Sequence, residues 1–167
     1  MMSFSKCHGA FPRLLICVYL AAAGTASVFF TNSVSAQMRL DPDCVHQEGS
    51  PQSCSHVVGC IGGDTLFVGG SIGWDSGTLR GELYSGEVCT GTWDNATGMA
   101  RFDCGDGVEG TVQYTVFDGA TGTAQGTGEM LDGRPIEAWS GNNIADYVQA
   151  ETGRVTLQCG VQEIPLS

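Results

Sequence analysis

Turn-forming dipeptides divide this chain into short runs that favour β-strands, and this pattern restricts the fold more than any other feature. From Leu79 onward, runs rich in Val, Thr, Phe and Tyr are separated by Ser85-Gly86, Asp118-Gly119 and Asp132-Gly133. Asp-Gly favours a two-residue hairpin turn because both central residues of a type I′ turn need positive φ. Residues 110–117 alternate apolar with polar side chains, and no segment sustains a helical period. The sequence therefore predicts an all-β fold, either an antiparallel meander sheet or a small, partly closed barrel.

The expected domain organisation has two parts after an N-terminal leader. Residues 37–64 predict an irregular, cysteine-rich N-terminal segment, and residues 65–167 predict the antiparallel β domain. Residues 69–77 are expected to form a glycine-rich connection, and residues 142–149 a short helical turn. The strands are expected at 65–68, 79–84, 87–93, 99–104, 110–117, 123–131, 135–139 and 152–159.

The leader has the three parts of a cleaved secretory signal peptide, which we predict for residues 1–36. Lys6 and Arg13 supply positive charge, residues 14–30 form an apolar run, and Ala36 ends a small-residue cleavage site. A permanent membrane anchor is the alternative, but no basic stop-transfer cluster follows the run. The mature chain is therefore expected to be exported, periplasmic or extracellular, and without a membrane span.

The expected mature chain is strongly acidic. It carries all 18 acidic residues against five arginines and no lysine, a formal charge of −13. Such a charge repels nucleic acid and anionic lipid head groups. It attracts cations, so a basic protein or an envelope component is the expected partner, with solubility alone as the alternative.

Six cysteines remain after residue 36, and an even number in an exported chain predicts disulfides. In the hairpin centred near Ala96, counting outward places Trp93 opposite Ala100 and Cys89 opposite Cys104. Directly opposed side chains have Cβ atoms about 4.5–5.5 Å apart, close to what a disulfide needs, which favours a Cys89–Cys104 bond. For the remaining four cysteines, the preferred pairing among those possible is Cys44–Cys54 with Cys60–Cys159.

One stretch of the predicted β domain resembles a MORN-type hairpin. Residues 126–141 contain paired glycines, a β run, an Asp-Gly turn and a strand that reaches Trp139. The resemblance covers residues 79–141, with a shorter spacing before the turn and with Ile136 and Ala138 where an aromatic residue and a glycine are usual. Families of this kind are mostly scaffolds and binding surfaces, so the resemblance implies a non-enzymatic role.

The chain also resembles the periplasmic inhibitors of C-type lysozyme. Residues 102–107 lead into the β run at 110–117, and Cys159 closes the last predicted strand. The resemblance implies a small exported β-barrel, a Cys104–Cys159 disulfide and inhibition of a basic envelope-degrading enzyme. The loop motif that enters the lysozyme cleft has no counterpart in this sequence.

Two Cys-x-His pairs and a further cysteine form the sharpest local cluster of chemical groups. Thiolate and imidazole are ligands that zinc and copper prefer, so a metal-binding exported protein is one hypothesis. The alternative is that the cysteines are oxidised and the histidines are solvated loop residues. The five candidate ligands are Cys44, His46, Cys54, His56 and Cys60.

The sequence predicts no catalytic site and no cofactor. A nucleophile needs a nearby base, and after residue 36 only His46 and His56 are available. The sequence contains no Gly-x-Ser-x-Gly elbow. A phosphate-binding loop of the P-loop type needs a lysine, and residues 37–167 contain none. We therefore expect an exported, non-enzymatic β domain with a binding or cell-envelope structural role, with enzyme inhibition and metal binding as alternatives.

Two further motifs leave alternatives open. Trp74, Trp93 and Trp139 are expected to be packing residues, with an aromatic sugar-binding platform as the alternative. The acidic turn at residues 103–109 could hold calcium, but it does not match the ligand order of an EF-hand.

Overall fold

The computed structural model describes residues 38–105 and 108–166. Within these residues, eight consecutive antiparallel strands form a closed barrel, which confirms the all-β prediction and closes the sheet fully. The signal peptide predicted for residues 1–36 lies outside the described residues.

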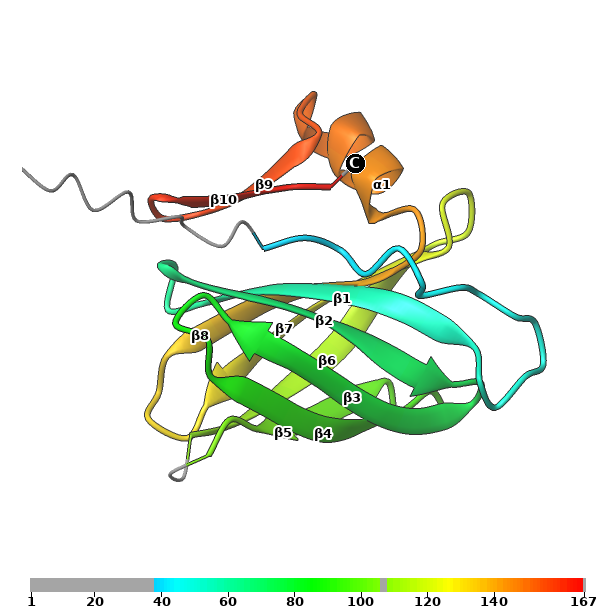
Figure 1. Ribbon diagram of the computed structural model, residues 1–167, viewed down its shortest axis with the longest axis horizontal. Helices are drawn as coiled ribbons and strands as arrows, with labels where there is room; N and C mark the ends of the chain where they lie inside the picture. The colour runs from blue at the N-terminus through cyan, green and yellow to red at the C-terminus, as the bar shows by residue number, and fades with distance from the viewer. Residues whose placement is uncertain (1–37, 106–107, 167) are drawn as a thin grey trace, which may run out of the picture. The chain divides into compact units, whose positions relative to one another are not determined.

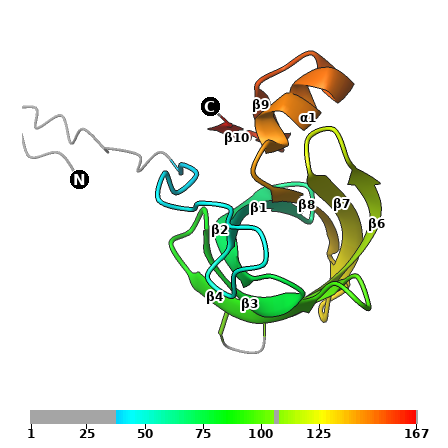
Figure 2. The same cartoon turned by 90° about the vertical axis from the view of Figure 1, so that its right-hand side faces the viewer.

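Each barrel strand pairs with its neighbours in the sequence, and the first strand pairs with the last to close the ring (Figures 1 and 2). Closure gives every strand of the ring two partners, so the barrel itself exposes no edge. The strands are β1 (Cys54–Ile61), β2 (Thr65–Gly73), β3 (Ser76–Leu83), β4 (Val88–Asp94), β5 (Met99–Asp103), β6 (Glu109–Asp118), β7 (Thr123–Met130) and β8 (Pro135–Gly141).

A helix and a hairpin follow the barrel and cover part of its outer wall (Figure 1). They are α1 (Ile144–Thr152), β9 (Thr156–Cys159) and β10 (Gln162–Pro165), and β9 pairs with β10 alone. The hydroxyl of Tyr147 on α1 donates a hydrogen bond of 2.7 Å to Oε1 of Gln125 on β7. In the part of the chain that the structure describes, no helix is long and apolar enough to cross a membrane.

Strand alternation divides the buried side chains between two cores. On β1, Val57 points into the barrel while Val58 points outward beneath the C-terminal elements. The inner core continues through side chains such as Phe67 and Leu79, and the outer core includes Trp139. The strands near the C-terminal elements therefore bury both faces.

Glycines on the inner wall let neighbouring strands approach closely. A Cβ atom at Gly69 would collide with the backbone of Arg80 on β3, and one at Gly91 would collide with the backbone of Arg101 on β5. The many glycines of the sequence thus serve strand contact as well as turns.

The prediction of an irregular segment over residues 37–64 is wrong for Cys54–Ile61, which is β1. This strand pairs with β2 on one side and with β8 on the other. Because it is buried on both faces, its sequence lacks the polar–apolar alternation of a half-solvated strand. The β domain therefore begins at Cys54.

Two other predicted segments differ from the structure. The glycine-rich connection over residues 69–77 is mostly strand, because β2 runs to Gly73 and β3 begins at Ser76. The predicted strand over 152–159 is only Thr156–Cys159, because α1 extends to Thr152. That strand forms a separate hairpin and takes no part in closing the barrel.

A β-bulge in β6 changes which residues face the interior. The pairing register with β7 shifts between Tyr114 and Val116, so the alternation expected over residues 110–117 holds only as far as Tyr114. Val116 then faces solvent, and Phe117 takes the next inner position, opposite Ala124.

The described residues contain three disulfides: Cys44–Cys54, Cys60–Cys159 and Cys89–Cys104. The predicted hairpin register is present, since Trp93 pairs with Ala100. All three bonds are the pairings that the sequence favoured. The Cys104–Cys159 bond implied by the resemblance to lysozyme inhibitors is wrong.

We expect each disulfide to stabilise the fold more, the longer the loop that it closes. The sequence separations are 99 for Cys60–Cys159, 15 for Cys89–Cys104 and 10 for Cys44–Cys54. In the chain-entropy model, loops of about 100 and about 15 residues contribute roughly 4.7 and 3 kcal/mol. Urea unfolding of the three paired-alanine variants should show the largest loss for Cys60→Ala/Cys159→Ala. A larger loss for Cys44→Ala/Cys54→Ala would contradict the expected order.

Candidate functional site

The barrel is filled at one end and hollow at the other. Large side chains such as Ile61, Phe67 and Ile136 fill the first end and leave a void of only about 20 Å³. Toward the other end lies a cavity of about 500 Å³. A cavity of this size in the mouth of a barrel is in the range that proteins use for small molecules.

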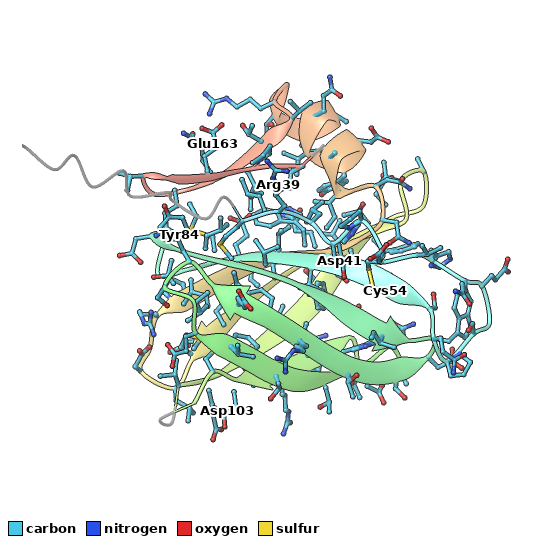
Figure 3. All side chains as sticks on the ribbon, viewed as in Figure 1. Arg39, Asp41, Cys54, Tyr84, Asp103 and Glu163 are labelled. Atoms are coloured by element: carbon cyan, nitrogen blue, oxygen red, sulfur yellow. A yellow bond between two sulfur atoms is a disulfide. The ribbon has the colours of Figure 1, made fainter. Side chains whose placement is uncertain are left out.

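We call the hollow end the mouth; the β2–β3, β4–β5 and β6–β7 turns surround it. Figure 2 looks along the barrel from this end, with the N-terminal segment in cyan across one side of the ring. Tyr84 and Asp103, labelled in Figure 3, mark the opposite end.

Inward-facing positions give the mouth one polar wall and one aromatic wall. Ser55 on β1, Ser71 on β2 and Ser140 on β8 line the polar wall, on three adjacent strands. Trp93 on β4 and Tyr114 on β6 line the opposite wall. The cavity can therefore surround an apolar molecule and still offer it hydrogen-bonding groups.

The bulge and a turn bring two more aromatic residues to the rim. Phe117 lines the cavity although its side chain is 72% exposed, so it stands at the opening. Trp74 lies in the β2–β3 turn, where its carbonyl oxygen accepts a hydrogen bond of 3.3 Å from Nδ2 of Asn95 in the β4–β5 turn. This bond ties two turns of the mouth together.

The N-terminal segment supplies another part of the rim. The Cys44–Cys54 disulfide holds it at the start of β1, near the labelled Asp41 and Cys54 of Figure 3. Within the segment, Oγ of Ser53 lies 3.3 Å from Nδ1 of His46. The His46 ring packs against Trp74 with 5.5 Å between ring centroids. His46 and Ser53 both line the cavity.

The aromatic wall carries polar groups without partners. Nε1 of Trp93 is buried and has no hydrogen-bond partner among the described residues. The Tyr114 hydroxyl likewise has none in the described parts of the chain. Burial raises the pKa of Tyr114 well above its ordinary value, so its hydroxyl keeps its proton and remains a donor. An unpaired donor such as Nε1 of Trp93 costs free energy because it is buried where neither water nor a molecule in the cavity reaches it to accept a hydrogen bond.

The acidic side chains at the mouth outnumber the basic ones among the described lining residues. Among the described residues that line the cavity, none is lysine or arginine. Asp75 and Asp94 lie at the rim, and both are exposed. The electrostatic field at the opening therefore disfavours anions.

The five candidate metal ligands do not form a metal site. Cys44, Cys54 and Cys60 are all in disulfides and cannot act as thiolates. His46 lies at the mouth, whereas Nε2 of His56 lies 2.8 Å from the carbonyl oxygen of Asp41. Across the described residues, no group of three or more His, Cys, Asp or Glu side chains could hold an ion. Residues 106–107 of the acidic turn predicted at 103–109 lie outside the described residues.

The three tryptophans divide between the site and the packing. Trp74 and Trp93 line the cavity, and Trp139 packs outside the barrel against the C-terminal elements. The predictions did not identify Tyr114, Phe117 or the serine wall as site residues. The alternation of residues 110–117 placed Tyr114 on the inner face, but the bulge that brings in Phe117 has no comparable signal.

A second depression, of about 560 Å³, lies on the outer wall of β4–β7. It is lined by exposed side chains such as Thr92, Arg101 and Glu129 and is open to solvent. Because this depression is open to solvent, a small molecule bound there would stay in contact with water, whereas the mouth can enclose it.

Fold and site together define a small, disulfide-bonded, eight-stranded up-and-down barrel with a cavity at its mouth. Comparison of the chain with protein-family models, with curated proteins and with solved structures gave no match. The cavity is therefore the feature of this molecule that bears on its function.

We predict that the hollow and filled halves of the barrel respond differently to the same substitution. Ala124 on β7 lines the cavity, and Ala138 on β8 lies in the filled core. Ala138→Phe overpacks that core and should lower the free energy of unfolding by about 1–3 kcal/mol or more. Ala124→Phe has free volume to enter and should change it by less than about 1 kcal/mol. Chemical denaturation of both variants tests this, and equal losses would mean that the mouth is not hollow.

Proposed function

We propose that this protein is an exported, non-enzymatic binding protein that holds a small, mainly apolar molecule in the mouth of its barrel. The observation that carries the proposal is the cavity of about 500 Å³, with aromatic side chains on one wall and the packed core below it. Small-molecule sites are typically concave, largely apolar and supplied with a few polar groups, as this one is.

The groups at the mouth favour binding over catalysis. His46 is the one histidine among the described lining residues, and its Nδ1 is engaged with Ser53. The nearby carboxylates of Asp75 and Asp94 are exposed at the rim. A nucleophile needs a base within hydrogen-bond reach and a third group to orient that base, and in the described residues no such third group is hydrogen-bonded to His46.

The disulfides support the proposed location. Three bonds in the described residues require an oxidising compartment for their formation, as the periplasm and the extracellular space provide. The predicted leader over residues 1–36 points to the same route.

Binding of Nile red, an uncharged apolar dye whose emission rises in a dry environment, tests the proposal. The wild-type protein should bind the dye with a dissociation constant in the micromolar range. Ala124→Phe should weaken binding at least tenfold, because the new ring occupies the cavity. Thr127→Phe, on the outward face of the same strand, is the matched control and should bind as the wild type does.

No binding by the wild type, or equal binding by both variants, would overturn the proposed site. Robust turnover in a hydrolase screen of the purified protein would overturn the non-enzymatic role. Both measurements use the full disulfide-bonded chain after its leader.

Because the protein is acidic, we propose a basic protein or an envelope component as a second partner. Its expected charge of −13 would speed encounter with a basic enzyme such as C-type lysozyme, and added salt should weaken the effect. Calorimetry at micromolar protein should give heat that declines with ionic strength. Absence of both heat and inhibition would remove this partner.

A further inference from the structure

We infer that the ligand of the mouth is an organic cation, with its apolar body inside the cavity and its positive group at the opening. This inference rests on the proposed function and names the chemical class of its ligand. The class comprises amines and quaternary ammonium compounds that carry an apolar body, and it excludes fatty acids and other anions.

The first argument is the charge of the turns that surround the opening. Each of the three turns carries a carboxylate: Asp75 lies in the β2–β3 turn, Asp94 ends β4 and Asp118 ends β6. The turns themselves contain no lysine or arginine. The opening therefore has a negative electrostatic potential that raises the local concentration of cations.

These carboxylates are not neutralised by the protein. Hydrogen bonds from the side chain of Thr121 and the backbone N–H of Ala120 lower the pKa of Asp118, so it stays ionised. Among the described residues, the one ion pair is that of Arg134 with Asp132, at the filled end. The negative charge at the mouth is therefore available to a ligand.

The second argument is the arrangement of these groups around the ring. The β2–β3 and β6–β7 turns are four strands apart in a closed ring of eight, so they lie on opposite sides of the opening, with the β4–β5 turn between them. The first two turns also bring Trp74 and Phe117 to the rim. A positive group at the centre of the opening thus faces carboxylates from three directions and aromatic rings, whose faces attract cations, from two.

A metal ion does not fit this arrangement. Over the described residues, no three His, Cys, Asp or Glu side chains come close enough together to hold one. Carboxylates on separate turns act through their combined field and not by coordination. This favours a larger cation, held by its body as well as by its charge.

The third argument is the difference between the opening and the depth of the cavity. Val57, Leu79 and Ala100 are buried and line the inner part, where they offer dispersion contacts to a hydrocarbon body. A charged group at this depth would lose its water without gaining a carboxylate. The hydroxyl of Tyr114 also lines the cavity, and because it can donate or accept, it serves a polar atom of the body without setting the ligand's charge. The positive group therefore belongs at the opening.

Three probes with the same 2-naphthylmethyl body test the inference by displacement of Nile red at pH 8 and low ionic strength. Their heads are a trimethylammonium cation, a tert-butyl group of the same shape without charge, and a sulfonate anion. The cation should bind about tenfold or more tightly than the sulfonate. Sodium chloride at about 0.5 M should shrink this ratio, because salt screens charges at an exposed opening.

Variants assign the preference to the carboxylates of the mouth. Asp75→Asn/Asp94→Asn keeps the side-chain size and the Oδ1 of residue 94 that accepts a hydrogen bond of 3.0 Å from the backbone N–H of Thr97. It should weaken binding of the cation, relative to the tert-butyl probe, by about threefold or more, as the loss of two exposed ion pairs allows.

Glu87→Gln/Glu109→Gln is the matched control. It removes the same net charge from two exposed side chains at the filled end. It should change the ratio of cation to tert-butyl affinity by less than about twofold, because both positions are far from the opening and screened by solvent.

The outcomes separate this inference from the proposed function. Displacement of Nile red with no preference for the cation over the sulfonate overturns the ligand class and leaves the cavity as a binding site. Equal losses in the two double variants also overturn it, because net charge alone would then explain the preference. Failure of the wild type to bind Nile red or any of the three probes overturns both.

Discussion

The pairing of β1 with β8 is the contact on which the rest of the structure depends. It joins the first and last strands of the meander from His56 opposite Gly141 to Ile61 opposite Ile136. Without it, the remaining strands would be an open sheet with two unpaired edges and no enclosed interior. β1 also carries Cys60, which faces outward and is bonded to Cys159, so the C-terminal hairpin is attached to the closing strand.

In the closed barrel, the size of the inward-facing side chains determines which part of the interior is packed and which part is a cavity. Toward one end, Phe67 stacks against Phe102. The side chains there are packed so closely that a Cβ atom added at Gly110 would collide with Phe102 and Met130. Toward the other end, serine and alanine replace these large residues on several strands. The barrel therefore combines a packed core, which stabilises it, with a hollow that the core holds open.

Local features of the sequence predict much of this fold. The hairpin register that opposes Cys89 to Cys104 follows from counting around one loop, and an Asp-Gly turn lies between β7 and β8 as expected. Local sequence features do not predict the pairing of strands that are distant in the sequence. The sequence of β1 predicts no strand because both of its faces are buried, so it lacks the alternation of a half-solvated strand.

The candidate site was less predictable than the fold for the same reason. The sequence suggests Trp93 as part of a possible aromatic platform, but Ser55 and Ser140 on the opposite wall come from the two strands that close the ring. A single serine in a strand gives no sign that it faces a cavity. The bulge that brings Phe117 to the rim arises from the pairing of β6 with β7 and not from a recognisable motif.

The closing contact also has a consequence for how the chain folds. Because β1 must wait for β8, the barrel closes only after the intervening strands have formed or are ready to pair, so ring closure comes late in folding. Before closure, Cys60 is near Cys54 and Cys44 in sequence but far from Cys159, at a separation of 99 residues. Premature oxidation would favour the near partners, so correct assembly gains from a compartment that reshuffles disulfides as well as forming them.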